Sequence, residues 1–189
     1  YVANVEQPKY RSIKRAGAFE LRDYPPLVVA EITRAGDRQT AVGQGFRALA
    51  AYILAKERPG EAIAMTAPVT QQREETIAMT VPVTQTPKAG NDWSIRFIMP
   101  SKYTIETLPE PQNADIRLVE IPAKLRAAIR FSGVATDELI AGKQAELQEW
   151  MKTQGIQPSG PPTYAYYNDP FTPGFLRRNE VMFDVAKAP

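Results

Sequence analysis

The sequence contains no cysteine and no histidine among its 189 residues. The absence of cysteine excludes disulfides and thiolate nucleophiles, so cysteine usage says nothing about the redox compartment. Without either residue type the chain cannot form a Ser-His-Asp triad, a Cys-His nucleophile or the usual zinc sites. Any metal-free acid–base chemistry would therefore fall to Asp, Glu, Lys or Tyr.

Long hydrophobic runs and a strong net charge are also missing. No stretch approaches the roughly 20 apolar residues that are needed to cross a bilayer. Lys and Arg number 23 against 21 Asp and Glu, and the resulting net charge of +2 argues against a nucleic-acid partner, which requires a concentrated basic face. With 43% hydrophobic and 23% charged residues, the composition is that of an ordinary globular domain.

The first part of the chain predicts two strands and a helix. Residues 19–24 largely alternate apolar and polar side chains, as a half-buried strand does, and two prolines end this segment. Residues 27–33 are rich in β-branched side chains and predict a second strand. Residues 39–56 predict a helix, because apolar residues recur there at spacings of four, three and four: Val42, Phe46, Leu49 and Ile53.

A near-repeat follows this helix. The segment 63–71, Ile-Ala-Met-Thr-Ala-Pro-Val-Thr-Gln, recurs at 77–85 with one substitution. Each copy alternates apolar and polar residues, so we expect two strands joined by the polar run 72–75 as a hairpin. Each copy also holds a proline, which should place part of each strand at a sheet edge or bulge. We assign Met65 and Met79 to the core.

The remaining segments give much the same order of elements again. They predict strands at 93–99, 116–121, 127–131, 163–167 and 180–185 and a helix at 137–154. A proline-broken connection lies between the strands 93–99 and 116–121. Two such halves, at about 10–107 and 112–187, would pack their helices on one curved antiparallel sheet. The sequence therefore predicts a single α+β domain, 1–189, with pseudo-two-fold repetition.

Several phrases, taken in this order, are similar to those of one protein family. They are Pro8-Lys9-Tyr10, FELRDYP at 19–25, GFRALAAYI at 45–53, MTAPV at 65–69, FIMP at 97–100, LPEP at 108–111, YNDPF at 167–171 and RRNEV at 177–181. Together they resemble the SOUL haem-binding protein family, in particular its bacterial and plant members with a doubled Met-Thr-x-Pro-Val hairpin. The resemblance runs from about Pro8 to Val185.

The resemblance implies a distorted antiparallel β-barrel of two pseudo-symmetric halves, each with one helix. It also implies non-covalent binding of haem or a free porphyrin, beside the 39–56 helix and near the 169–178 loop. The chain departs from the family pattern in two places. The run 54–57, Leu-Ala-Lys-Glu, stands where many members have Gly and Asn, and the histidine with which some members ligate iron is missing.

A porphyrin is a flat apolar disc with two propionates on one edge, so its site needs aromatic faces and cations at the rim. Arg47 and Lys56 lie nine residues apart on the predicted helix and would point to opposite sides. Lys56 is close in angle to Tyr52 and is the stronger candidate of the two cations. The 169–178 loop adds three more candidates: Phe171, Phe175 and Arg177. The competing interpretation is a solvated helix face with loop aromatics that plug the barrel end.

Iron could be bound in this chain only by Tyr, Met, Lys or water. Tyr52 is the best of these ligands, but the sequence favours a ring held by stacking and salt links, with no metal site in the protein. The string 177–180, Arg-Arg-Asn-Glu, is interpreted as a strand entry where Arg and Glu tie the loop to the barrel. Lys14 and Arg15 form too short a basic run to indicate a nucleic-acid or membrane patch.

These observations favour a monomeric, non-catalytic carrier, buffer or sensor for haem or a related tetrapyrrole, without a stable protein partner or a nucleic-acid ligand. One alternative is a small-molecule sensor of the effector-binding type, and another is a hydrolase that acts on a hydrophobic ligand through a buried carboxylate or Tyr. The start at Tyr1 rather than Met, directly before family-like sequence, favours an exported or membrane-tethered precursor.

Overall fold

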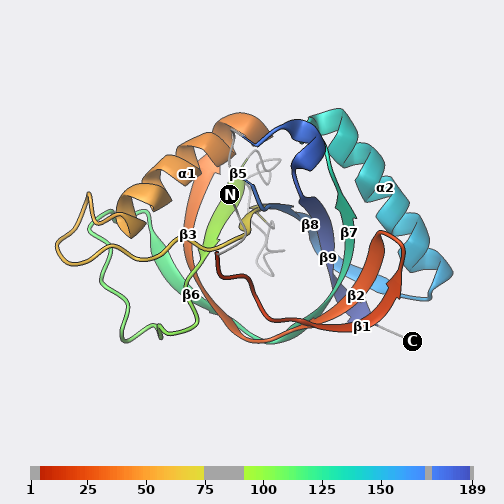
Figure 1. Ribbon diagram of the computed structural model, residues 1–189, viewed down its shortest axis with the longest axis horizontal. Helices are drawn as coiled ribbons and strands as arrows, with labels where there is room; N and C mark the ends of the chain where they lie inside the picture. Colours follow the sequence, from red (N-terminus) through yellow and green to blue (C-terminus); the bar gives the residue numbers. More distant parts are fainter. Residues whose placement is uncertain (1–4, 75–91, 169–171, 188–189) are drawn as a thin grey trace, which may run out of the picture.

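The computed structural model describes residues 5–74, 92–168 and 172–187. These residues form nine strands, two α-helices and one 3-10 turn (Figure 1). In chain order the elements are β1 (Arg11–Ala16), β2 (Phe19–Tyr24), β3 (Leu27–Ala35), α1 (Arg38–Ile53), β4 (Val69–Arg73), β5 (Asp92–Ile98), β6 (Arg117–Ile121), β7 (Lys124–Phe131), α2 (Asp137–Thr153), β8 (Gln157–Tyr166), η1 (Gly174–Leu176) and β9 (Asn179–Lys187).

All nine strands belong to one antiparallel sheet, with the order β1-β2-β7-β9-β8-β4-β5-β3-β6. The predicted α+β class is confirmed. Counted outward from the central β8–β4 pair, the strands are β8, β9, β7 and β2 on one side and β4, β5, β3 and β6 on the other. The two sides therefore correspond strand by strand. If the chain is divided into the two predicted halves, β2 of the first half pairs with β7 of the second, and β6 of the second half pairs with β3 of the first. That division itself stays a prediction.

The predicted barrel is present only in part, because the sheet does not close. Its two edges are β1 and β6, which do not pair with each other. The ring seen in Figure 1 is completed by the chain itself: β2 runs on into β3 and β6 into β7. Tyr24 is opposite Lys124 and Leu27 is opposite Ile121, with prolines between the two pairs. Because proline cannot donate a hydrogen bond to a neighbouring strand, the hydrogen bonding between the two chain segments is interrupted there. The two segments, β2–β3 and β6–β7, continue side by side across the interruption.

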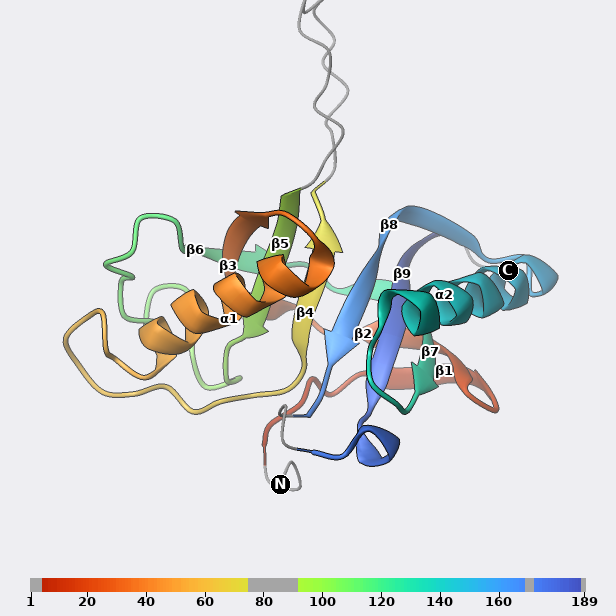
Figure 2. The ribbon, with the colours of Figure 1, turned by 90° about the horizontal axis from the view of Figure 1, so that it is seen from above.

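Both helices cover the outer face of the curved sheet (Figures 1 and 2), and each has its own apolar core. Leu49 of α1 and Ile95 of β5 are fully buried in one core. Leu147 of α2 lies fully buried in the other. Neither helix of the described chain is long and apolar enough to span a bilayer.

The buried face of α1 is rotated from the predicted stripe. Phe46 is 40% exposed, whereas Gly45 and Tyr52 are buried. A Cβ atom on Gly45 would lie 2.8 Å from two side-chain atoms of Ile95. The missing side chain therefore lets α1 approach β5 closely, and this contact turns Gly45 rather than Phe46 toward the sheet.

Other boundaries differ from the predictions for local reasons. β1 was not predicted, because all six of its residues are exposed and leave no apolar alternation. β4 begins at Val69 rather than at residue 63, and its polar end includes residues expected in the hairpin loop. The second copy of the repeat, 77–85 with Met79, lies outside the described residues. Met65 is half-buried and packs against the α1 core, as expected.

Candidate functional site

Tyr52, the predicted stacking residue and candidate iron ligand, lies in the core. Its side chain is fully buried, and its hydroxyl donates a hydrogen bond to the Pro109 carbonyl at 2.6 Å. The Arg58 guanidinium lies 4.9 Å from the centre of its ring. Burial raises the pKa of Tyr52, which further disfavours a phenolate. Tyr52 thus packs in the core beneath α1, and its role as a ligand-contacting residue stays a prediction.

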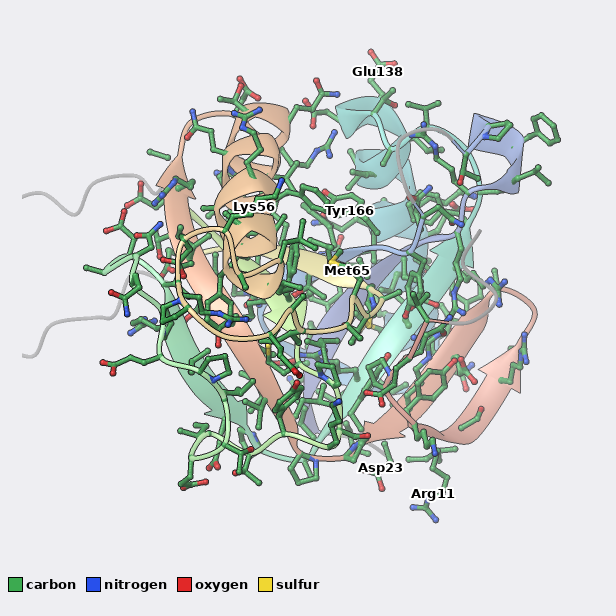
Figure 3. All side chains as sticks on the ribbon, turned by 60° about the vertical axis from the view of Figure 1, so that its left-hand side comes forward. Arg11, Asp23, Lys56, Met65, Glu138 and Tyr166 are labelled. Atoms are coloured by element: carbon green, nitrogen blue, oxygen red, sulfur yellow. The ribbon has the colours of Figure 1, made fainter. Side chains whose placement is uncertain are left out.

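Of the two cations predicted on the first helix, Arg47 lies on the helix and Lys56 does not. α1 ends at Ile53, and Ala55 follows with a φ of 57°. Lys56 therefore lies beyond the helix, and its predicted angular proximity to Tyr52 does not apply. Arg47 is on α1 and is exposed. Figure 3 shows Lys56 on the α1 side of the molecule, away from Arg11 and Asp23 on β1 and β2.

The loop before β9, called the late loop here and described at residues 172–178, presents apolar side chains to solvent. Phe175 and Leu176 on η1 are 77% and 62% exposed. Arg177 follows directly and donates from Nε to the Thr172 carbonyl at 2.7 Å. Phe171 lies outside the described residues.

A hollow of about 470 Å³ lies between this loop, the β1–β2 turn and the end of β7. We call it the arginine pocket, because five arginines and one acidic residue line it: Arg15, Arg22, Arg130, Arg177, Arg178 and Glu20. Tyr10, Phe19, Phe131, Phe175 and Leu176 are the large apolar and aromatic side chains of its wall. Of the six predicted site residues, Phe175 and Arg177 line the arginine pocket. Arg47, Tyr52 and Lys56 are not among its described lining residues.

Arg22, which lines the arginine pocket, belongs to a buried ion pair between β2 and β9. Arg22 donates to the two carboxylate oxygens of Glu180 at 2.7 and 2.6 Å, and to Glu20 at 2.7 Å. Burial alone would raise the pKa of Glu180, but the hydrogen bonds and charge of Arg22, with a contribution from Arg178, lower it below its ordinary value. The pair is thus charged and structural. Tyr10 covers it, with its ring centre 4.2 Å from the Arg22 guanidinium carbon.

Arg178 ties the late loop to the same carboxylate. It donates to Glu180 at 3.0 Å, and its guanidinium stacks 3.9 Å from the centre of the Tyr167 ring. The Tyr167 hydroxyl also donates to Glu180, at 2.9 Å. The interpretation of the 177–180 string as a strand entry that ties the loop to the sheet is therefore confirmed. The buried Nε of Arg178 has no hydrogen-bond partner among the described residues.

Sequence reasoning missed the cations and the phenol that other elements bring to this pocket. Arg15 and Arg130 are exposed residues at the ends of β1 and β7, far apart in sequence. Tyr10 precedes β1, in a segment whose sequence signal is its similarity to the family. An isolated basic residue on a strand carries no signal of its own, so only the strand pairing brings these side chains together.

The carboxylates in and under the arginine pocket are poorly suited to general acid catalysis. Glu20 would have its pKa raised by burial, but hydrogen bonds from Ser12 and Arg22 lower it. The pKa of Glu180 is lowered in the same way. A general acid at neutral pH requires the opposite shift.

A second hollow of about 490 Å³ lies on the outer face, between the N-terminal ends of α1 and α2. Trp93 and Tyr164 form part of it, with ring centres 6.1 Å apart. Two arginines line it. The Arg73 guanidinium carbon lies 4.6 Å from the centre of the Trp93 ring. Arg38 is paired with Asp137 at 2.7 Å and bonded to the Tyr166 hydroxyl at 3.1 Å. Those polar contacts join the two helices and leave Arg38 committed to the fold.

Comparison with known proteins gives one family and several related folds. A family model described as SOUL heme-binding protein matches residues 5–184. The C-terminal domain of EcmrR aligns with a TM-score of 0.64 at 15% identity, over 95% of this chain and 99% of that one. A hydrolase from Listeria innocua aligns with a TM-score of 0.59 at 14% identity, over 92% of this chain and 94% of that one. No curated protein sequence matches. At these identities the similarity to solved structures shows the fold alone.

Proposed function

Because the chain belongs to the SOUL haem-binding protein family, we propose that it binds haem or a related tetrapyrrole, without catalysis, in the arginine pocket. The family membership supports the ligand class. The choice of pocket rests on one observation: exposed Phe175 and Leu176 lie on the same wall as several arginines.

The chemistry of this pocket suits a flat ring with two carboxylates. The ring would contact the apolar side chains of Phe175 and Leu176, and its propionates would pair with the exposed guanidinium groups of Arg15 and Arg130. The volume of about 470 Å³ falls within the range of roughly 300–1,000 Å³ that holds small ligands. The pocket is open on one side, so part of the ring would stay in solvent.

The chain offers iron only a weak set of ligands. It has no His and no Cys, and the Tyr52 hydroxyl is already bonded in the core. Tyr10 is the phenol in the wall of the arginine pocket. Bound haem would supply redox chemistry through its iron, whereas the residues on this wall would bind and orient the ring.

The alternative functions have less support. A sensor of the effector-binding type would use the same pocket for a different ligand, and the fold similarity to the EcmrR domain is compatible with it. The fold similarity to a hydrolase is not matched by a carboxylate with a raised pKa at the pocket, since Glu20 and Glu180 both shift downward. The monomeric state stays a prediction.

The proposal can be tested by titrating the protein with haemin and with metal-free protoporphyrin, following the Soret band and tryptophan fluorescence. Exposed ion pairs contribute about 1 kcal/mol or less each, so Arg15→Glu with Arg130→Glu should weaken binding about tenfold. Added salt should shrink this loss, because it screens exposed charges. Arg47→Glu on α1 is the matched control. If Arg47→Glu weakened binding more than the double variant, the ligand would lie beside α1 instead, and the pocket assignment would be wrong.

A further inference from the structure

Large apolar side chains gather at one exposed point of the fold. Val134, Phe175 and Leu176 are 54%, 77% and 62% exposed. Val134 is on the loop before α2, and this loop abuts η1: the Gly133 N–H donates to the Gly174 carbonyl at 2.8 Å. A Cβ on Gly174 would lie 2.9 Å from a Val134 methyl carbon.

We call these three residues the apolar tip. Figure 2 shows η1 (blue) at the edge of the molecule. The other exposed large apolar side chains of the described chain are Ile13, Phe46 and Leu54, on β1, on α1 and just past its end. The apolar tip is therefore a local concentration of exposed apolar surface.

Positive charge lies on the side of the apolar tip that faces the arginine pocket. Arg15, Arg130 and Arg177 line the same hollow as Phe175 and Leu176. The Lys14–Arg15 run is too short to indicate a membrane patch by itself. In the fold, Arg130 of β7 lies on the same side of the sheet end as this run, because β1 pairs with β2 and β2 pairs with β7. The paired strands thus build a basic rim that no single segment of the sequence carries.

We propose that the apolar tip docks the protein on an anionic membrane surface. Phe175 and Leu176 would enter the boundary between headgroups and acyl chains, and Arg15 and Arg130 would face the anionic headgroups. Peripheral membrane binding combines buried apolar area with electrostatic attraction in this way. A membrane fits better than a folded protein partner, since a stable protein interface buries about 800 Å² on each side and the tip is only one turn and one short loop.

The proposal does not rest on the proposed tetrapyrrole function, because it concerns the surface of the protein without haem. The two ideas do share a wall of the arginine pocket. If both hold, an apolar ligand dissolved in the bilayer would reach the pocket directly from the membrane.

The test uses the full chain without haem and vesicles of phosphatidylcholine, with or without phosphatidylglycerol. We expect cosedimentation with the phosphatidylglycerol vesicles that weakens as salt is added, and much weaker binding to pure phosphatidylcholine. Phe175→Trp provides a second readout, because the native Trp93 and Trp150 are 3% and 9% exposed. Its fluorescence should shift to shorter wavelength on vesicle binding.

Matched variants separate docking at the apolar tip from general adhesion. Phe175→Ser with Leu176→Ser should lower the vesicle partition coefficient about tenfold or more, because it removes the inserting side chains. Leu54→Ser, at a site 47% exposed and distant in sequence, is the control. Arg15→Glu with Arg130→Glu should lower binding about tenfold or more. Arg47→Glu, on exposed α1 surface, should lower it less.

Each part of this experiment has an outcome that would contradict the docking proposal. If the parent protein does not bind anionic vesicles, or if the tip variants bind as the parent does, the docking proposal is wrong. Equal loss from Leu54→Ser and the tip variants would also overturn it. Vesicle binding without any haemin binding would support docking and remove the tetrapyrrole proposal, and haemin binding without vesicle binding would do the reverse.

Discussion

Buried charge is concentrated at a few residues of the inner face of the sheet. Arg22 is 2% exposed and Glu180 is 1% exposed, yet each finds its full set of partners from β2, β9 and the late loop. A buried ion pair of this kind contributes little net stability, but removing one partner leaves an uncompensated charge in the interior. Removing one of these residues should therefore lower the free energy of unfolding by more than the attraction between them contributes.

We expect Glu180→Gln to lower the free energy of unfolding by about 3–5 kcal/mol, because it leaves the Arg22 and Arg178 guanidinium groups without their carboxylate. Glu120→Gln is the control, since Glu120 is an exposed residue of β6 and its change should stay within about 0.5 kcal/mol. Urea denaturation followed by circular dichroism measures both values. Equal, small effects would mean that the network is not structurally required.

A second prediction at this scale concerns iron. With no His or Cys in the chain, haem and metal-free protoporphyrin should bind within about tenfold of each other, or about 1.4 kcal/mol. Ferric haem should also lack the low-spin spectrum of a bis-imidazole or thiolate complex. A thousandfold preference for haem would contradict this expectation. In that case Tyr10→Phe decides whether the phenol in the pocket wall is the ligand.

Among the elements, α1 depends on a close contact with the sheet. In an exposed helix interior, Gly→Ala stabilises by roughly 1 kcal/mol because alanine has the higher helix propensity. At Gly45 the added Cβ would meet Ile95 at 2.8 Å, and Ile95 is fully buried in β5. The contact should therefore make Gly→Ala at position 45 destabilising instead of stabilising.

We expect Gly45→Ala to destabilise the protein by about 1–3 kcal/mol, as overpacking in a core does. Gly43→Ala is the matched control on the same helix, because nothing lies within 4 Å of its added Cβ, and it should stabilise by up to about 1 kcal/mol. Chemical denaturation of the two variants gives the comparison. Stabilisation by both would show that α1 can move away from β5 at no cost.

For the molecule as a whole, the buried titratable groups set the pH range of stability. Glu20 and Glu180 have pKa values below their ordinary value of 4.5, so the unfolded chain binds protons more readily than the folded one as the pH falls. Their contribution is present above pH 4.5 and is lost as the pH falls through their folded pKa values. Burial raises the pKa of Tyr24 and Tyr166 to about 12 from 10.0. Their contribution is present below pH 10 and is lost as the pH rises toward 12.

The free energy of unfolding should therefore fall at both ends of the pH range. A series of urea denaturations across pH measures the two limbs. Glu180→Gln should make the acid limb shallower, with Glu20 still contributing to it. Tyr166→Phe should make the alkaline limb shallower, with Tyr24 still contributing. If Tyr166→Phe left the alkaline limb unchanged, the assignment of part of that limb to Tyr166 would be wrong.

Taken alone, the sequence determined the fold class, the two helices and most strands, because these depend on local periodicity of apolar residues. β2 was predicted at its observed ends, and the family resemblance is shown to be membership over residues 5–184. The sequence could not find β1, whose residues are all exposed, nor the rotation of α1, which a contact between Gly45 and Ile95 decides. Of the predicted site residues, the tertiary structure buries Tyr52 and gathers Phe175 and Arg177 with other arginines. Strand pairing alone brings Arg15 and Arg130 together, because residues more than 100 positions apart meet only where hydrogen bonding between strands fixes their register.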